Sequence, residues 1–280
     1  MASAEKKAVC MLCPHRCALQ EGQTGFCRAR GNRQGRIESL NYGKITSLAL
    51  DPIEKKPLRR FHPGSFILSV GSFGCNLRCA FCQNYEISQS GQEIPSRMIL
   101  PEELAELAKS LTKKSPGNLG AAFTYNEPLI GWEYLLDTAR LLRAQGLKTV
   151  LVTNGMIMEK PLRELLPWVD AMNIDLKAFR QDFYDWAGGD LETVKQTIRL
   201  SAEACHVEIT TLILPGKNDS EEEMERESDW LAEIDPSLPL HISRYFPRYQ
   251  SSLPATPSDT IHRLMAAAQR HLRFVYPGNL

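Results

Sequence analysis

The fold is decided by the stretch Ser72-Phe73-Gly74-Cys75-Asn76-Leu77-Arg78-Cys79-Ala80-Phe81-Cys82-Gln83-Asn84, which places three cysteines at the spacing C-x3-C-x2-C. It follows residues 66–70, a short apolar run typical of a buried parallel strand. Three thiolates on one loop can hold three corners of an Fe–S cluster and leave the fourth iron open to a substrate or cofactor. The alternatives are a zinc knuckle or reduced core cysteines, but no fourth ligand stands at ordinary zinc spacing after Cys82.

A second cysteine group precedes this loop: Cys10, Cys13, Cys17 and Cys27, at the spacing C-x2-C-x3-C-x9-C. Four thiolates make a closed site that suits structural zinc or a second, fully ligated Fe–S cluster able to relay electrons, with reduced free thiols as the third alternative. We expect His15 to be a bystander. Because a segment of roughly 30 residues with few apolar side chains cannot fold on its own core, residues 1–36 are interpreted as a Cys-rich metal-binding segment.

Composition is that of a globular protein, with 43% hydrophobic and 24% charged residues in a chain of 280. The formal net charge of +0 gives no overall basic field, so we do not expect nucleic acid to be a partner. Residues 1–7 contain no apolar targeting segment and no apolar run of 18 residues occurs, which predicts a cytoplasmic protein without a membrane partner.

Beyond the cysteine loop, short apolar runs alternate with helical periods. We expect a hairpin over residues 36–50 around Asn41-Tyr42-Gly43, within a hairpin and connection spanning 37–63. Further strands are expected at 120–124, 149–152, 171–175, 207–213 and 238–242, and helices at 101–111, 132–142, 192–204, 221–234 and 258–272. Residues 64–280 therefore predict an α/β fold, a partial parallel (β/α)6 TIM-like barrel.

Polar residues stand where several of these strands end, which is where catalytic groups gather in a parallel barrel. The candidates are Asn126 and Glu127, Thr153 and Asn154, and Asp175 and Lys177. Taken singly, each is also explained by ordinary turn chemistry or by the end of a strand.

The cysteine loop, including Phe81 before its last cysteine, resembles the signature of the radical S-adenosylmethionine (SAM) superfamily. The resemblance implies that Cys75, Cys79 and Cys82 ligate a [4Fe–4S] cluster whose fourth iron binds the amino and carboxylate groups of SAM. An electron from a donor such as flavodoxin or ferredoxin would then split SAM into methionine and a 5′-deoxyadenosyl radical.

The strand-end residues resemble the activating-enzyme branch of that superfamily, typified by pyruvate formate-lyase activating enzyme. In that branch a Gly-Gly-Glu-Pro motif binds the SAM amino group. Here Tyr125 and Asn126 replace the glycines, while Glu127 is retained. The resemblance further places Thr153 and Asn154 near the SAM ribose. It matches Asp175 and Lys177 to an Asp-x-Lys motif whose lysine lies near the SAM carboxylate.

Residues 12–17, 25–28, 51–57 and 82–89 together look like the radical SAM member of the AmmeMemoRadiSam group. Longer members carry a C-terminal cysteine-containing tail, so we expect any function of that tail to be missing here. The expected activity is hydrogen abstraction, as a glycyl-radical-enzyme activase, as a modifier of another protein or peptide, or on a small molecule. The alternative is a non-catalytic Fe–S redox or sensing protein.

Several remaining residues have two interpretations each. Cys205 is expected to be a core thiol. The group His241, Arg244, Tyr245 and Phe246 either contacts adenine or substrate or belongs to the core and rim. Arg78, Arg244 and Arg248 either line the mouth of the barrel, where they would favour an anionic substrate, or are solvated charges.

Overall fold

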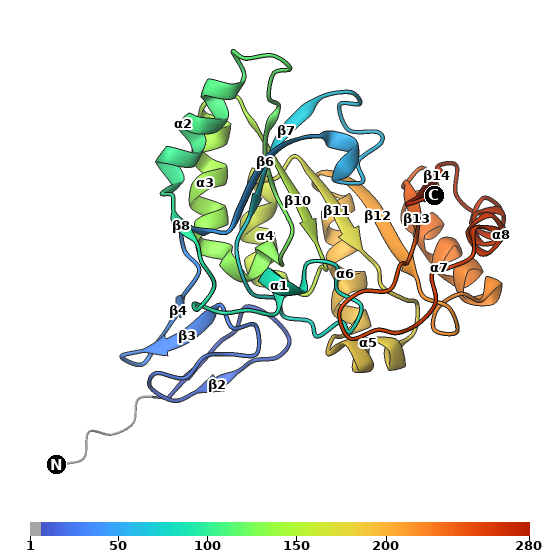
Figure 1. Ribbon diagram of the computed structural model, residues 1–280, viewed down its shortest axis with the longest axis horizontal. Coiled ribbons are helices and arrows are strands. Elements are labelled where there is room, and N and C mark those ends of the chain that lie inside the picture. Colours follow the sequence, from blue (N-terminus) through green and yellow to red (C-terminus); the bar gives the residue numbers. More distant parts are fainter. Residues whose placement is uncertain (1–6) are drawn as a thin grey trace.

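The central sheet has the strand order β14-β13-β12-β11-β10-β9-β7-β6 in the computed structural model, which describes residues 7–280 (Figure 1). Its strands are β6 (Ser47–Pro52), β7 (Phe66–Gly71), β9 (Gly120–Phe123), β10 (Lys148–Thr153), β11 (Ala171–Asp175), β12 (His206–Ile213), β13 (Leu240–Arg244) and β14 (Val275–Gly278). Strand β6 pairs antiparallel with β7, and every other pairing is parallel. Because β6 and β14 are the two edges of this order, the sheet stays open.

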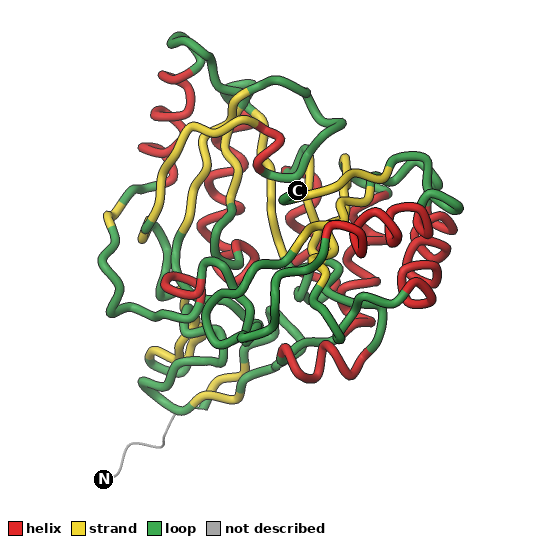
Figure 2. Tube along the Cα trace, turned by 45° about the vertical axis from the view of Figure 1, so that its right-hand side comes forward, coloured by secondary structure: helices red, strands yellow, loops and turns green. Residues whose placement is uncertain are grey.

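Helices flank the strands on both sides in Figure 1, and the curvature of the strand layer is visible in Figure 2. They are α1 (Tyr85–Ser88), α2 (Pro101–Leu111), α3 (Trp132–Ala144), α4 (Glu159–Leu165), α5 (Gln181–Ala187), α6 (Leu191–Ala202), α7 (Glu221–Ile234) and α8 (Ser258–Ala268), with 3-10 turns η1 (Ile53–Lys55), η2 (Pro128–Gly131) and η3 (Leu166–Trp168). The expected α/β architecture with a mostly parallel sheet is confirmed.

Local sequence explains these elements. Strands β7 and β9 are buried because helices and neighbouring strands cover an apolar run. Gly120 is needed for close approach, since a Cβ there would stand 1.9 Å from the Lys148 carbonyl oxygen of β10. Helix α7 begins at Ser220, whose side chain accepts a hydrogen bond from Glu223 N, and three glutamates fill its first turn.

The hairpin expected over residues 36–50 is wrong. Strand β4 (Arg36–Ser39) instead pairs with β3 (Arg30–Arg33) through Gln34 and Gly35, both of which have positive φ as a tight hairpin turn requires. Gly43 does turn the chain, but β5 (Lys44–Ile45) pairs with β8 (Arg97–Met98), while β6 pairs with β7. Strand β14 was not expected.

Short hairpins form the N-terminal part of the chain and lie beside the carboxyl ends of the barrel strands (Figure 1). Strand β1 (Ala8–Val9) pairs with β2 (Ala18–Leu19) and packs against β4. A partly buried ion pair joins this part to α3, because the buried Arg30 donates two hydrogen bonds to Glu133 at 2.6 and 2.7 Å. Residues 1–6 of the expected Cys-rich segment lie outside the described residues. Among residues 7–280, no helix has the length and hydrophobicity needed to span a membrane.

A buried carboxylate stabilises the amino-terminal end of the sheet. Glu208 on β12 accepts hydrogen bonds from His206 Nε2 at 2.9 Å and from His241 Nε2 at 2.6 Å. It also accepts hydrogen bonds from the backbone N–H groups of Arg59 and Arg60, at 3.0 and 2.7 Å. Burial alone would raise the pKa of Glu208, but these four hydrogen bonds outweigh it and lower the pKa to about 2. The group therefore fastens the chain between η1 and β7 to the barrel.

Candidate functional site

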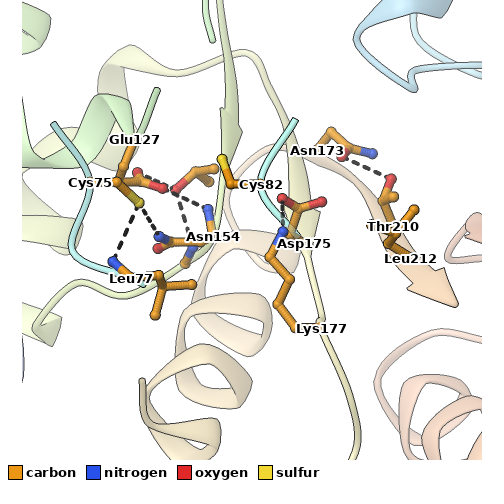
Figure 3. Close-up of polar contacts among 12 residues, drawn as sticks. Cys75, Leu77, Cys82, Glu127, Asn154, Asn173, Asp175, Lys177, Thr210 and Leu212 are labelled. Atoms are coloured by element: carbon orange, nitrogen blue, oxygen red, sulfur yellow. Dashed lines mark hydrogen bonds and ion pairs between the residues drawn. The ribbon is translucent and has the colours of Figure 1, made fainter. Parts of the chain in front are cut away.

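A cavity of about 340 Å³ lies where the carboxyl ends of the parallel strands meet the cysteine loop. All nine residues expected at the main site line it. They are Cys75, Cys79, Cys82, Asn126, Glu127, Thr153, Asn154, Asp175 and Lys177. Figure 3 shows Glu127 and Asn154 on one side of Cys82, and Asp175 and Lys177 on the other. The structure therefore brings the whole expected set into one space, although the set spans about a hundred residues of sequence.

Cys75 receives two N–H donors at its sulfur. Leu77 N lies 3.3 Å from Cys75 Sγ, and Asn154 Nδ2 lies 3.6 Å from it (Figure 3). Cys82 Sγ lies 3.1 Å from the hydroxyl oxygen of Ser88, in α1. Donors directed at a sulfur stabilise its thiolate form. Loading of a metal must displace protons, because burial raises the pKa of Cys79 to about 12.

Asn126 holds the start of the cysteine loop. Its Nδ2 donates to the backbone oxygens of Phe73 and Gly74, each at 3.1 Å, and its Oδ1 accepts from Ser72 N at 2.9 Å. Asn154 is similarly engaged, since its Nδ2 also donates to Asn76 Oδ1 at 3.0 Å. Both side chains line the cavity while fixing the loop that carries Cys75.

Glu127 is a buried carboxylate that faces the cavity. Its oxygens accept hydrogen bonds from Leu129 N at 2.9 Å, from the Thr153 hydroxyl at 2.6 Å and from Asn154 N at 2.8 Å. No salt bridge within residues 7–280 involves it. Burial is the largest influence and raises the pKa of Glu127 to about 7, against the effect of the three hydrogen bonds. A cation that enters the cavity beside Glu127 would relieve this cost.

Lys177 and Asp175 form an ion pair on the opposite wall, with Nζ 2.6 Å from Oδ2 (Figure 3). Burial would lower the pKa of Lys177, but the adjacent carboxylate outweighs it and raises that pKa. The ammonium group is therefore charged at neutral pH and lies beside the cavity.

Tyr125 adopts a positive φ of 73° at the position that separates β9 from Asn126. Its hydroxyl donates to Asp51 Oδ2 at 2.9 Å, and Ser69 and Lys56 bond the same oxygen at 2.8 and 3.1 Å. The Lys56 ammonium also lies 4.9 Å from the centre of the Tyr125 ring. A non-glycine residue with this backbone conformation needs such support, because positive φ costs energy for residues with a Cβ.

Comparison with known proteins identifies the family. The family model described as "Radical SAM superfamily" matches residues 69–227, which is more than half of the chain. The chain belongs to the radical SAM superfamily. It is similar to "Uncharacterized protein MJ0808" of Methanocaldococcus jannaschii, with 39% identity across 99% of this chain and 82% of that protein.

Two further radical SAM comparisons are more distant. A pyruvate formate-lyase-activating enzyme of Clostridium pasteurianum is 27% identical across 55% of this chain and 64% of its own length. The crystal structure of a radical SAM methyltransferase from Sphaerobacter thermophilus superimposes with a TM-score of 0.61 at 14% identity, covering 78% of this chain and 67% of that one. At this identity the superposition shows a shared fold.

The residues around the cavity fit the cofactors that radical SAM enzymes use, a [4Fe–4S] cluster and SAM. Three cysteines line one cavity, and N–H donors point at one of their sulfurs. A buried carboxylate without a cationic partner faces the same space, as an amino acid ammonium group would require. The cavity volume lies within the range of roughly 300–1,000 Å³ typical of small-molecule sites.

The cavity of this radical SAM protein has lining residues that sequence analysis did not single out. They are Lys55, Pro57, Thr210, Leu212, Ser243 and Asn279, among others. Lys55 belongs to the 51–57 motif, whose sequence gave no sign that the chain folds back to the cavity. Strand alternation was the available signal for Thr210 and Leu212, because residues two apart on β12 face the same side.

Other expected residues lie away from the cavity. Arg78 stacks on Phe26, with its guanidinium 3.9 Å from the ring centre, and donates to the Phe26 carbonyl oxygen. Arg244 donates to Thr256 O at 2.5 Å, and Arg248 is exposed. Among residues 7–280, the cavity wall includes none of these arginines, and their role at the mouth of the cavity, where they would favour an anionic substrate, stays a prediction.

The group at the end of β13 also has other contacts. His241 bonds to Glu208, the Tyr245 side chain is fully buried with its hydroxyl 2.8 Å from Ser251 Oγ, and the Phe246 ring is exposed. These residues therefore occupy positions in the core and at the rim. Cys205 is partly buried against the core, as expected of a core thiol.

The four N-terminal cysteines line a separate small cavity of about 10 Å³. The Arg30 guanidinium lies against the same cavity, where its charge would balance thiolates. As the side chains stand, no three His, Cys, Asp or Glu residues between 7 and 280 surround a position for one metal ion. His15, which lies between Cys13 and Cys17, has its Nε2 2.8 Å from the backbone oxygen of Asn76, which connects this group to the cysteine loop.

Proposed function

We propose that this radical SAM enzyme holds a [4Fe–4S] cluster through Cys75, Cys79 and Cys82 and reductively cleaves SAM there. When bound, the cluster and SAM supply an electron and a 5′-deoxyadenosyl radical that abstracts hydrogen from a substrate. The observation that carries the proposal is the single cavity that unites three cysteine sulfurs with Glu127, a buried carboxylate that has no cationic partner.

The protein's own residues would orient SAM within this cavity. The Glu127 carboxylate accepts a hydrogen bond from the SAM ammonium group. The hydroxyl of Thr153 and the backbone N–H of Asn154 hold the Glu127 carboxylate in place. The ammonium group of Lys177 binds the SAM carboxylate, and Asp175 keeps that ammonium in position. Asn126 and Asn154 line the adjoining wall. Leu77, Phe81 and Leu212 supply apolar lining that excludes water from the reacting centre.

The test is anaerobic reconstitution followed by reduction with dithionite, addition of SAM and measurement of 5′-deoxyadenosine. Cys79→Ala should lose the cluster's EPR signal and at least 99% of the cleavage, because two thiolates do not hold a cluster with one open iron firmly. Cys205→Ala is the matched control and should retain both. An intact cluster without cleavage would favour the second candidate, a non-catalytic redox or sensing protein.

The substrate we favour is a protein or peptide, such as a glycyl-radical enzyme, ahead of a small molecule. Similarity to pyruvate formate-lyase-activating enzymes supports this choice. Flavodoxin or ferredoxin would supply the electron, and we place the protein in the cytoplasm. Residues 64–280 would form the catalytic core, with 37–63 as its connection to the metal-binding segment 1–36.

We also propose that Cys10, Cys13, Cys17 and Cys27 bind a second metal, either zinc or a second Fe–S cluster. The shared cavity of the four cysteines supports the proposal. Elemental analysis of anaerobically purified protein tests it: about one zinc per chain indicates a structural ion, and about eight irons indicate two clusters. About four irons and no zinc would contradict it. Cys13→Ser should lose this metal and keep part of the SAM cleavage.

A further inference from the structure

Charge is distributed unevenly in this chain. Its formal net charge is +0, yet residues 7–40 contain six basic and two acidic side chains. We call residues 7–40 the basic lobe. Lys7, Arg16, Arg33 and Arg36 are exposed in the lobe. One further basic residue, Arg30, is buried and paired with Glu133, so it does not contribute to the surface.

Exposed apolar side chains lie beside these charges. Val9 and Met11, on either side of Cys10, are 48% and 56% exposed. Strand β1, which contains Val9, packs against β4, which begins at Arg36, so the two hairpins form one surface layer. Glu21 and Glu38 are also exposed in the lobe, so basic side chains outnumber acidic ones without excluding them. Exposed apolar residues on a surface of net positive charge are typical of a site that binds an acidic protein.

The basic lobe touches the cysteine loop directly. His15 Nε2 lies 2.8 Å from the backbone oxygen of Asn76, the residue after Cys75. Arg78 bonds to the Phe26 carbonyl oxygen. A Cβ on Gly74 would stand 2.5 Å from the Cys27 carbonyl oxygen, which shows how closely the two backbones approach. A protein bound to the lobe would therefore sit close to the loop that carries Cys75, Cys79 and Cys82, and none of the exposed lobe residues lines the cavity that SAM and substrate must fill.

We infer that the basic lobe is the docking surface for an acidic one-electron donor protein. The inference rests on the proposed function, which requires one electron for each SAM cleaved. That electron leaves the reduced donor and enters the cluster at Cys75, Cys79 and Cys82. Positive charge on the lobe attracts the acidic donor, and Val9 and Met11 provide apolar contact once it has docked.

The test compares two reductants on the reconstituted holoenzyme. Reduced flavodoxin serves as the acidic protein donor, and dithionite serves as a small molecule that needs no docking surface. The variant is Arg33→Glu/Arg36→Glu, which reverses two exposed charges that flank a hairpin turn. The matched control, Lys113→Glu/Lys114→Glu, makes the same charge change on exposed residues after α2, at the opposite end of the sheet.

The lobe variant should reduce 5′-deoxyadenosine formation with flavodoxin about tenfold or more at low ionic strength, and leave formation with dithionite unchanged. The control should be normal with both reductants. An unchanged rate with flavodoxin, an equal loss with dithionite, or an equal loss in the control would overturn the inference.

A second measurement uses the unmodified protein and does not depend on the folding of a variant. Flavodoxin-driven cleavage should slow as ionic strength rises through roughly 0.15 M, because salt screens the attraction, while dithionite-driven cleavage should not. Flavodoxin-driven cleavage that is insensitive to salt would overturn the inference. Absence of dithionite-driven cleavage would instead overturn the proposed function.

Discussion

The central sheet has a buried glutamate near each end of its strands, and the two differ in their hydrogen-bond partners. Glu208, at the amino-terminal end, is paired with two histidines and two backbone N–H groups, which lower its pKa to about 2. Glu127, at the carboxyl end, receives three neutral donors, and burial raises its pKa to about 7. Of these two glutamates, the poorly compensated one lies at the end that holds the cysteine loop.

This difference separates a structural group from a functional one. Glu208 has all its partners inside the chain, so its interactions stabilise the fold. Glu127 lies against a cavity and lacks a cation, so the interaction that would compensate its burial must come from a ligand. Two equally buried glutamates therefore have different roles: Glu208 stabilises the fold and Glu127 awaits a ligand. Variants of the two glutamates can test this difference.

The largest expected effect is on the folding of Glu208→Ala. Removing this carboxylate leaves the buried His241, the half-buried His206 and two partly buried backbone N–H groups without this acceptor, so we expect a loss of about 3 kcal/mol in the free energy of unfolding. Chemical denaturation of the metal-free protein measures it. SAM cleavage per folded molecule should be unchanged. If the variant is as stable as the parent, Glu208 does not have the structural role assigned to it.

The stabilisation by Glu208 should also be measurable in the unmodified protein, as a loss of stability at acidic pH. Because the folded-state pKa of Glu208, about 2, lies below the ordinary glutamate value of 4.5, its stabilisation is fully present above pH 4.5 and is lost as the pH falls toward 2. The expected contribution is up to about 3 kcal/mol. Stability measured between pH 6 and pH 3 should fall less steeply in Glu208→Gln. Identical slopes would contradict the assignment.

Glu127→Gln tests the other end. The amide keeps the size of the side chain but cannot pair with an ammonium group, so SAM should bind about 10- to 100-fold more weakly, as expected for a lost charge-assisted hydrogen bond. Equilibrium binding to the reconstituted protein measures this. Glu208→Gln is the control and should bind SAM normally. The idea fails if both variants bind alike.

The last prediction concerns Glu227, a further buried glutamate that lies away from the cavity. Burial raises its pKa to about 8, and its hydroxyl partner, Thr211, does not offset this. Because the folded-state pKa is raised, its contribution to stability is present below pH 4.5 and is lost as the pH rises through 8. Glu227→Gln should change the free energy of unfolding by less than about 1 kcal/mol at pH 4, where Glu227 is protonated in both the folded and the unfolded state, and should stabilise the protein at pH 9, where only the unfolded state carries the charge without cost. Denaturation at both pH values decides this.

The parallel sheet was largely predictable because its strands are short, mainly apolar segments between helical periods. Residues 171–175 were expected as a strand and form β11 with the same bounds. Strand β14 escaped notice because Pro277 and Gly278 obscure the pattern, and an edge strand tolerates both. The hairpin over 36–50 failed because β4, β5 and β6 each pair with a different, distant partner. Local sequence does not specify such partners.

The site was predictable as a set, since short motifs stand at the ends of parallel strands. The hydrogen bonds among these residues were not predictable. The side-chain amides of Asn126 and Asn154 donate hydrogen bonds to the cysteine loop, and these bonds join residues about 50 and 80 positions apart in the sequence. Lys55 reaches the cavity because Asp51 and the β6–β7 pairing fold its segment back. Such contacts depend on the completed barrel.

The order of elements along the chain has a consequence for how the protein is made. All seven clustered cysteines precede β9, whereas Glu127, Thr153 and Asp175 come later. At roughly 5–20 residues per second, the ribosome needs about 10–40 s to complete the chain after Cys82. During that interval the thiols have emerged without the walls that later enclose them, and they are open to oxidation. The iron supply and the oxygen tension during translation will therefore decide how much of the protein can be loaded.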